Sequence, residues 1–123
     1  MEEMFDSNTR SLGDLAGVFE FDGETGYFYL YQIDMDCGNK ILGAMQIISG
    51  NPSFCETDIS IQWDTDERMV GLVIKQNLWA VFDSQDRAKF GGNYQTNAEP
   101  KIPLEISGKF VGRGKTDSPT GNA

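Results

Sequence analysis

Carboxylates are the main catalytic groups that this chain could offer, because its 123 residues contain 19 Asp and Glu side chains but no histidine. Without an imidazole, Ser-His and Cys-His nucleophiles and histidine-ligated zinc sites are excluded. A glycosidase-type mechanism would need two carboxylates facing each other across a substrate. Most acids fall at expected turns, whereas Glu20 lies inside an expected strand, where an outward, solvated position explains it better than catalysis. The sequence therefore predicts a protein that is not an enzyme.

The segment Asp34–Asn39 is the best candidate for a cation site. It places two carboxylates two residues apart before a glycine. The EF-hand pattern fails, however, because Gly38 is fifth rather than sixth and the twelfth residue is Met45 rather than glutamate. An ordinary acidic loop is the preferred interpretation, a weak surface calcium site is the alternative, and no metal or cofactor is expected.

Three tyrosines could form a contact surface. Tyr27, Tyr29 and Tyr31 alternate with Phe28 and Leu30, so in a strand the tyrosines share one face and the two apolar residues share the other. One of these faces must enter the core. An exposed row of tyrosines would suit binding, because the ring offers contact area at low entropic cost together with a hydroxyl. Alternatively both faces of the sheet are covered and the hydroxyls simply reach water, and the sequence leaves both interpretations open.

Negative charge is concentrated in the first part of the chain. Residues 1–67 hold 14 acids against Arg10 and Lys40, a net charge of −12, whereas residues 68–123 hold 5 acids and 8 bases, a net charge of +3, and the total is −9. Such a surface repels nucleic-acid phosphates and anionic lipid headgroups, so neither nucleic acid nor a membrane is an expected partner. It would speed encounter with a basic protein, and salt would weaken that effect. Solubility alone is the simpler explanation of the same charge.

Two aromatic runs around a glycine-containing turn predict a β-hairpin over Val18–Tyr31, with Gly23 and Gly26 supplying positive φ angles in the turn. Three later strands are joined by turns too short for a parallel crossover, which predicts an antiparallel meander. The stretch Ser84–Asn93 is expected to be a loop. The strands expected after the hairpin are Ile41–Ile48, Asp58–Trp63, Met69–Ile74, Leu78–Phe82 and a last one over Leu104–Val111.

The predicted fold is therefore all-β, an antiparallel meander of six or seven strands arranged as a sandwich or a partly closed barrel. A chain of this length fits one domain, with a flexible arm over residues 1–12, the β domain over 13–111 and a disordered tail over 112–123. No signal-peptide pattern or apolar run of transmembrane length is found, which favours a cytoplasmic location. Cys37 and Cys55 lack CxxC spacing and are expected to be two free thiols.

One stretch of the sequence resembles a known family. The segment Phe21–Tyr29, reading Phe-Asp-Gly-Glu-Thr-Gly-Tyr-Phe-Tyr, is followed by Ile61-Gln62-Trp63 and by Ala80-Val81-Phe82-Asp83. This pattern, over residues 18–83, is similar to a family of short bacterial proteins known as domain-of-unknown-function family 2251. The resemblance implies a bacterial, cytoplasmic, compact β domain, and it brings no catalytic residues with it.

These observations favour a non-enzymatic acidic protein that binds a basic protein partner, as an immunity protein or inhibitor neutralising a toxin would. The alternatives are a small-ligand-binding β-barrel and a carboxylate-dependent enzyme. The residues expected to contact the partner are the acids and tyrosines of the first half of the chain: Asp22, Glu24, Tyr27, Tyr29, Tyr31, Asp34, Asp36, Asp64, Asp66 and Glu67.

Overall fold

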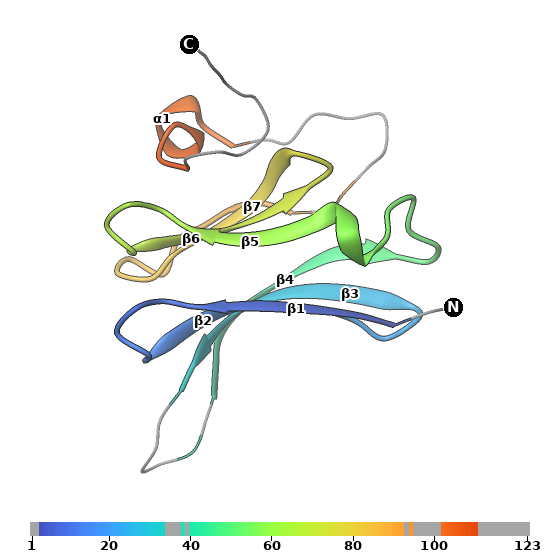
Figure 1. The fold of residues 1–123 in the computed structure, drawn as a ribbon, viewed down its shortest axis with the longest axis horizontal. Helices are drawn as coiled ribbons and strands as arrows, with labels where there is room; N and C mark the ends of the chain where they lie inside the picture. Colours follow the sequence, from blue (N-terminus) through green and yellow to red (C-terminus); the bar gives the residue numbers. More distant parts are fainter. Residues whose placement is uncertain (1–2, 34–37, 39, 93, 95–101, 111–123) are drawn as a thin grey trace.

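Two antiparallel four-stranded sheets stack face to face in the computed structural model, which describes residues 3–33, 38, 40–92, 94 and 102–110 (Figure 1). The first sheet has the order β1 (Met4–Thr9), β2 (Leu15–Phe21), β3 (Thr25–Gln32) and β4 (Lys40–Ser49). The second has the order β5 (Ile59–Trp63), β6 (Met69–Ile74), β7 (Asn77–Asp83) and β8 (Lys89–Gly91). A 3₁₀ turn, η1 (Glu56–Asp58), leads into β5, and a short helix, α1 (Leu104–Ser107), follows β8 in the chain.

The predicted all-β antiparallel fold is confirmed, in the form of a sandwich rather than a closed barrel. The hairpin of β2 and β3, the strand β4 and the meander of β5, β6 and β7 lie where the sequence predicts them. The predicted number of strands, six or seven, is too low, because the described residues form eight strands.

Three local predictions are wrong. Residues 4–9 form β1 rather than a flexible arm, because the backbone pairs with β2 along its whole length and Met4 enters the core. Residues 89–91, expected to be loop, form the short edge strand β8. The segment expected to be a last strand, Leu104–Val111, begins as the helix α1, and Ile106 of this helix packs in one cluster with Phe110, which follows the helix. The predicted tail, 112–123, lies outside the described residues.

The core lies between the two sheets and depends on two glycines. A Cβ atom on Gly17 would lie 2.5 Å from Val70 Cγ2, and one on Gly43 would lie 2.9 Å from the Phe82 ring. Because these glycines carry no side chains, the sheets approach closely. The ring centroids of Phe28 and Phe82 are 5.2 Å apart. The fully buried core side chains include Phe19, Phe21, Phe28, Leu30, Val70, Leu72, Ile74 and Phe82.

The turn between β2 and β3 is held by Asp22, whose Oδ1 accepts hydrogen bonds from the backbone N–H groups of Glu24 and Thr25. Gly23 adopts the expected positive φ, +101°. Gly26 does not, so that part of the prediction is wrong: it lies within β3, where a Cβ would come 3.1 Å from the Phe19 ring. Gly26 is therefore small because the Phe19 ring packs against it.

Both open edges of the sandwich are joined by hydrogen bonds. Where β1 meets β5, Asn8 Nδ2 donates to the Ile61 carbonyl at 2.8 Å and Trp63 Nε1 donates to the Asn8 carbonyl at 2.9 Å. At the other edge, the backbone N–H of Tyr94 donates to the Ile47 carbonyl at 2.6 Å. These bonds fix how the first sheet lies over the second.

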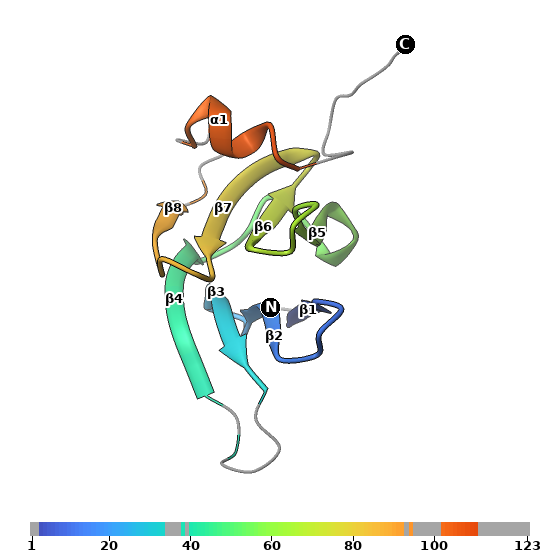
Figure 2. The same cartoon turned by 90° about the vertical axis from the view of Figure 1, so that its left-hand side faces the viewer.

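The outer faces of the two sheets differ. The second sheet is covered by α1 and the turn after it, where Ile106 and the fully buried Phe110 pack against residues such as Val73 and Val81 (Figure 1). A Cβ on Gly71 would lie 3.0 Å from the Phe110 ring, so this glycine makes room for the cover. On the first sheet, the end of β3 and the start of β4 curve away from the second sheet (Figures 1 and 2), next to a register shift between Leu30 and Tyr31.

Replacing Gly17 with alanine tests the close approach of the sheets. The added methyl group collides with Val70 and Ile61, so we expect Gly17→Ala to lower the free energy of unfolding by about 1–3 kcal/mol. Ser7→Thr, which adds one methyl at an exposed position of β1, should change it by less than about 0.5 kcal/mol. Urea denaturation of both variants measures the difference, and equal stabilities would contradict the packing described above.

Candidate binding face

The outer face of the first sheet presents an aromatic and apolar surface. Because Phe28 and Leu30 enter the core, Tyr27, Tyr29 and Tyr31 project from the opposite side of β3. Neighbouring strands add side chains beside them, since Val18 is opposite Tyr29 and Ile41 is opposite Tyr31. We call this surface the tyrosine face, and it consists of Phe5, Val18, Glu20, Tyr27, Tyr29, Tyr31 and Ile41.

The tyrosine face is exposed to solvent, whereas the outer face of the second sheet is covered by α1 and Phe110. Phe5 and Ile41 are 56% and 53% exposed, whereas Phe110 under α1 is 0% exposed. A hollow of about 320 Å³ lies on this face, and the described residues that line it belong to the first sheet. The residues that line it are Phe5, Val18, Glu20, Tyr29, Tyr31 and Ile41.

Among the described residues that line the hollow, Glu20 is the charged one. It stands in β2 between Phe5 of β1 and Tyr27 of β3, its partners in the strand register. The rings of Tyr27 and Tyr29 stack at 5.9 Å with an interplanar angle of 10°. Because Tyr27 does not line the hollow, the hollow lies on the side of Tyr29 toward Tyr31.

The field at the tyrosine face is negative. Burial raises the pKa of the Tyr29 hydroxyl, and the carboxylates of Glu20 and Asp22 raise it further. The sequence of the first sheet and its loops, residues 1–49, carries 9 acids against Arg10 and Lys40, a net charge of −7, compared with 10 acids and 8 bases, a net charge of −2, in the rest. The negative charge of the sequence is therefore concentrated in its first 49 residues.

Of the acids predicted to contact a partner, some accept hydrogen bonds within the protein and others are exposed. The Asp22 carboxylate holds the β2–β3 turn, and hydrogen bonds from Thr25 and Glu24 lower its pKa. Asp64 is 6% exposed and accepts from the backbone N–H groups of Arg68 and Met69, so it serves the β5–β6 turn. Glu67 accepts hydrogen bonds from Ser11. Glu24 and Asp66 are exposed, whereas Asp34 and Asp36 lie outside the described residues.

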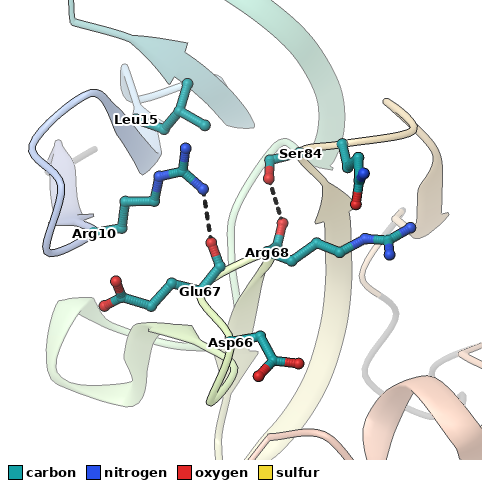
Figure 3. A pocket seen from close by; sticks show the side chains of 7 residues that line it. Arg10, Leu15, Asp66, Glu67, Arg68 and Ser84 are labelled. Carbon is teal, nitrogen blue, oxygen red and sulfur yellow. Dashed lines mark hydrogen bonds between the residues drawn. The ribbon is translucent and has the colours of Figure 1, made fainter.

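A second hollow, of about 310 Å³, lies between the sheets near the β5–β6 turn (Figure 3). Arg10 donates to the Glu67 carbonyl there, and the same guanidinium binds both oxygens of Asp14. Arg68 is likewise held by both carboxylate oxygens of Asp83, each at 2.9 Å. Both guanidinium groups have carboxylate partners within the protein. These arginines therefore stabilise the contact between the sheets, and they do not offer a free cation to a ligand in this hollow.

The structure offers no metal centre in the part of the chain that it describes, where no three Cys, Asp or Glu side chains gather to hold an ion. Cys55 is an exposed free thiol, and Cys37 falls outside the described residues. The described helices include none long and apolar enough to cross a membrane.

Sequence reasoning found the tyrosines of this face but missed the residues around them. Phe5 lies in the segment expected to be a flexible arm, and the place of Ile41 depends on the β3–β4 register shift. Glu20 was expected to point outward and it does so, being exposed on β2. The signal that could have found the set is the pairing of Glu20 with an aromatic residue on both neighbouring strands, and that requires the strand register.

The fold and this face define a two-sheet antiparallel β-sandwich with one outer face covered and an aromatic outer face open. The chain belongs to a family described as an uncharacterized protein conserved in bacteria, DUF2251, whose model matches residues 2–107. The match confirms the resemblance and extends it beyond residues 18–83, so that it includes β1 and α1. Comparison with curated proteins and with solved structures finds no match.

The Arg68–Asp83 pair predicts how stability depends on pH. Arg68, followed by the N–H groups of Asp86 and Gln85, lowers the pKa of Asp83 in the folded protein. The ionised Asp83 carboxylate therefore stabilises the folded protein above about pH 4, the ordinary pKa range of Asp. This stabilisation is lost as the pH falls through the lowered pKa. We expect Asp83→Asn to be less stable than the wild type at neutral pH, with a difference that shrinks in acid.

Urea denaturation at neutral and acidic pH measures this difference. Asp86→Asn is the matched control, because it removes the more exposed of the two carboxylates on Arg68 and should cost less. A wild-type-to-variant difference that stays constant with pH would contradict the assignment.

The tyrosine face also predicts a titration. Since Glu20 helps to raise the Tyr29 pKa, Glu20→Gln should move the Tyr29 ionisation toward its ordinary value near pH 10. Tyrosinate absorbance followed against pH, with Tyr29→Phe to assign the transition, measures the shift. Glu105→Gln removes the same charge on α1, beyond the second sheet, and should leave the titration unchanged, while an unmoved transition in Glu20→Gln would rule out the coupling.

Proposed function

We propose that this protein is a non-enzymatic binding protein that docks a basic protein on its tyrosine face, as an immunity protein or inhibitor of a toxin would. The observation that carries the proposal is the difference between the two outer faces. One is closed by Ile106 and Phe110, and the other leaves Phe5 and Ile41 more than half exposed around a hollow.

The residues of the open face are those that binding favours. Tyrosine is enriched at protein interfaces because its ring supplies large contact area with only two rotatable side-chain bonds to order. Tyr27 and Tyr29 are already ordered against each other by stacking, so less freedom is lost when a partner covers them. Phe5, Val18 and Ile41 add apolar area around the tyrosines.

Charge supports a basic partner. The sequence of the first sheet and its loops has a net charge of −7, and Glu20 brings a carboxylate into the face itself. Such a field attracts a positively charged protein and accelerates encounter, most strongly at low salt. The acids that serve turns, Asp22, Asp64 and Glu67, add to this field without having to touch the partner.

The two alternatives have less support. A small-ligand β-barrel would hold its ligand inside, and this sandwich brings its sheets together at Gly17 and Gly43 and fills the space with rings such as Phe28 and Phe82. A carboxylate-dependent enzyme would need a second carboxylate facing Glu20, and the described residues that line the hollow include no second acid.

Capture from a bacterial lysate tests the proposal. The immobilised protein should retain a basic protein whose capture fades as salt rises, and Tyr29→Ala together with Tyr31→Ala should abolish it. The purified partner should then bind in solution by calorimetry, and the double variant should weaken that binding by at least about 30-fold, the loss of two interface anchors that contribute more than about 1 kcal/mol each.

Leu104→Ala is the matched control, since it removes an 86% exposed apolar side chain beyond the second sheet and should leave capture intact. Equal capture by the double variant and by the wild type would contradict the proposal. So would a partner that is acidic, or one whose binding is insensitive to salt.

A further inference from the structure

The hollow on the tyrosine face combines one carboxylate with apolar and aromatic walls. In the part of the chain that the structure describes, Glu20 supplies its charge, and Phe5, Val18, Tyr29, Tyr31 and Ile41 supply the rest of its lining. A carboxylate beside aromatic rings attracts a cation in two ways, by direct charge and through the negative face of the rings. The hollow therefore suits a positively charged group better than a neutral one.

The protein already contains this combination elsewhere. The Arg10 guanidinium lies 5.7 Å from the centre of the Trp63 ring while Nε and Nη2 bind the two oxygens of Asp14. The internal contact joins a planar guanidinium, an aromatic ring and one carboxylate. The hollow offers aromatic rings and a carboxylate, and a guanidinium from a partner would complete the same combination.

A guanidinium fits these walls better than an ammonium. It is planar, weakly hydrated and able to pair with both oxygens of a carboxylate while it stacks on a ring. A lysine ammonium is compact and strongly hydrated, so apolar walls such as Val18 and Ile41 would strip water from it at a greater cost. Tyr27 stacks beside Tyr29 and does not line the hollow, which leaves space on the side of Tyr29 toward Tyr31.

We propose that this hollow is an arginine-side-chain pocket, in which Glu20 pairs with a guanidinium from the basic partner while Tyr29 and Tyr31 contact its plane. The inference rests on the proposed function and specifies it, because it names the side chain by which the partner is held. An exposed arginine in an extended or loop segment of the partner would be the central contact of the interface.

Three short peptides test the pocket without knowledge of the partner. They share the sequence acetyl-Gly-Gly-Xaa-Gly-Gly-amide, with arginine, lysine or citrulline at Xaa, and citrulline has nearly the shape of arginine without its charge. Nuclear magnetic resonance titrations of the wild-type protein should show saturable shifts at Glu20, Tyr29 and Tyr31 with the arginine peptide. Binding of the citrulline peptide should be weaker by about tenfold or more, as loss of an ion pair and a cation–π contact predicts.

Lysine should bind more weakly than arginine, and Glu20→Gln should abolish the preference for arginine over citrulline. Glu105→Gln, which makes the same change of charge on α1, should preserve it. The peptide comparison uses the wild-type protein, so it remains decisive even if a variant is unstable. Equal binding of arginine and citrulline, equal binding of arginine and lysine, no binding, or shifts centred away from these three residues would each overturn the pocket.

The two proposals fail separately. If Tyr29- and Tyr31-dependent capture of a basic protein persists while the arginine peptide does not bind the hollow, the pocket is wrong and the docking face stands. If the face instead mediates pairing of two copies of this chain, light scattering will show a dimer that Tyr29→Ala separates, and both proposals are overturned.

Discussion

Each β-sheet of a two-layer sandwich can bury only one face against the other sheet, and that constraint organises this protein. The inner faces meet closely because Gly17 and Gly43 carry no side chains to hold them apart. Both outer faces also carry large apolar or aromatic residues, so each needs cover or a use. The second sheet receives cover from α1 and Phe110, with Gly71 making room for the ring. In the described part of the chain, the first sheet keeps its tyrosines and Phe5 toward solvent.

Many of the acidic side chains in the described residues also stabilise the fold locally. Asp22 and Asp64 accept backbone hydrogen bonds in turns, Asp14 and Asp83 hold guanidinium groups, and Asp58 binds the backbone N–H of Cys55 before β5. Glu20 differs because it stands in the middle of a strand on an open aromatic face. Long-range attraction can therefore come from the whole set, whereas Glu20 is a carboxylate placed for a specific contact on this face.

The sequence predicted the strands whose side chains alternate or whose turns carry clear signals, including the β2–β3 hairpin and the β5–β7 meander. It failed where tertiary contacts outweigh local pattern. The polar segment Met4–Thr9 becomes a strand because β2 pairs with it and the Asn8 side chain donates to the Ile61 carbonyl of β5. Gly26 resembled a turn residue and instead makes room for Phe19. The tyrosines were found from their spacing, whereas their surroundings depend on a register shift in β4 that no local pattern encodes.

The proposed binding role requires most directly that the tyrosine face is exposed in the free protein while the outer face of the second sheet is covered. Relaxation of side-chain ring protons by a water-soluble paramagnetic reagent measures this in one experiment, because the effect falls steeply with distance from solvent. The rings of Tyr27, Tyr29 and Tyr31 should relax markedly faster than the ring of Phe110, which is 0% exposed. Tyrosine rings as protected as Phe110 would mean that the face is covered, and they would contradict the central claim.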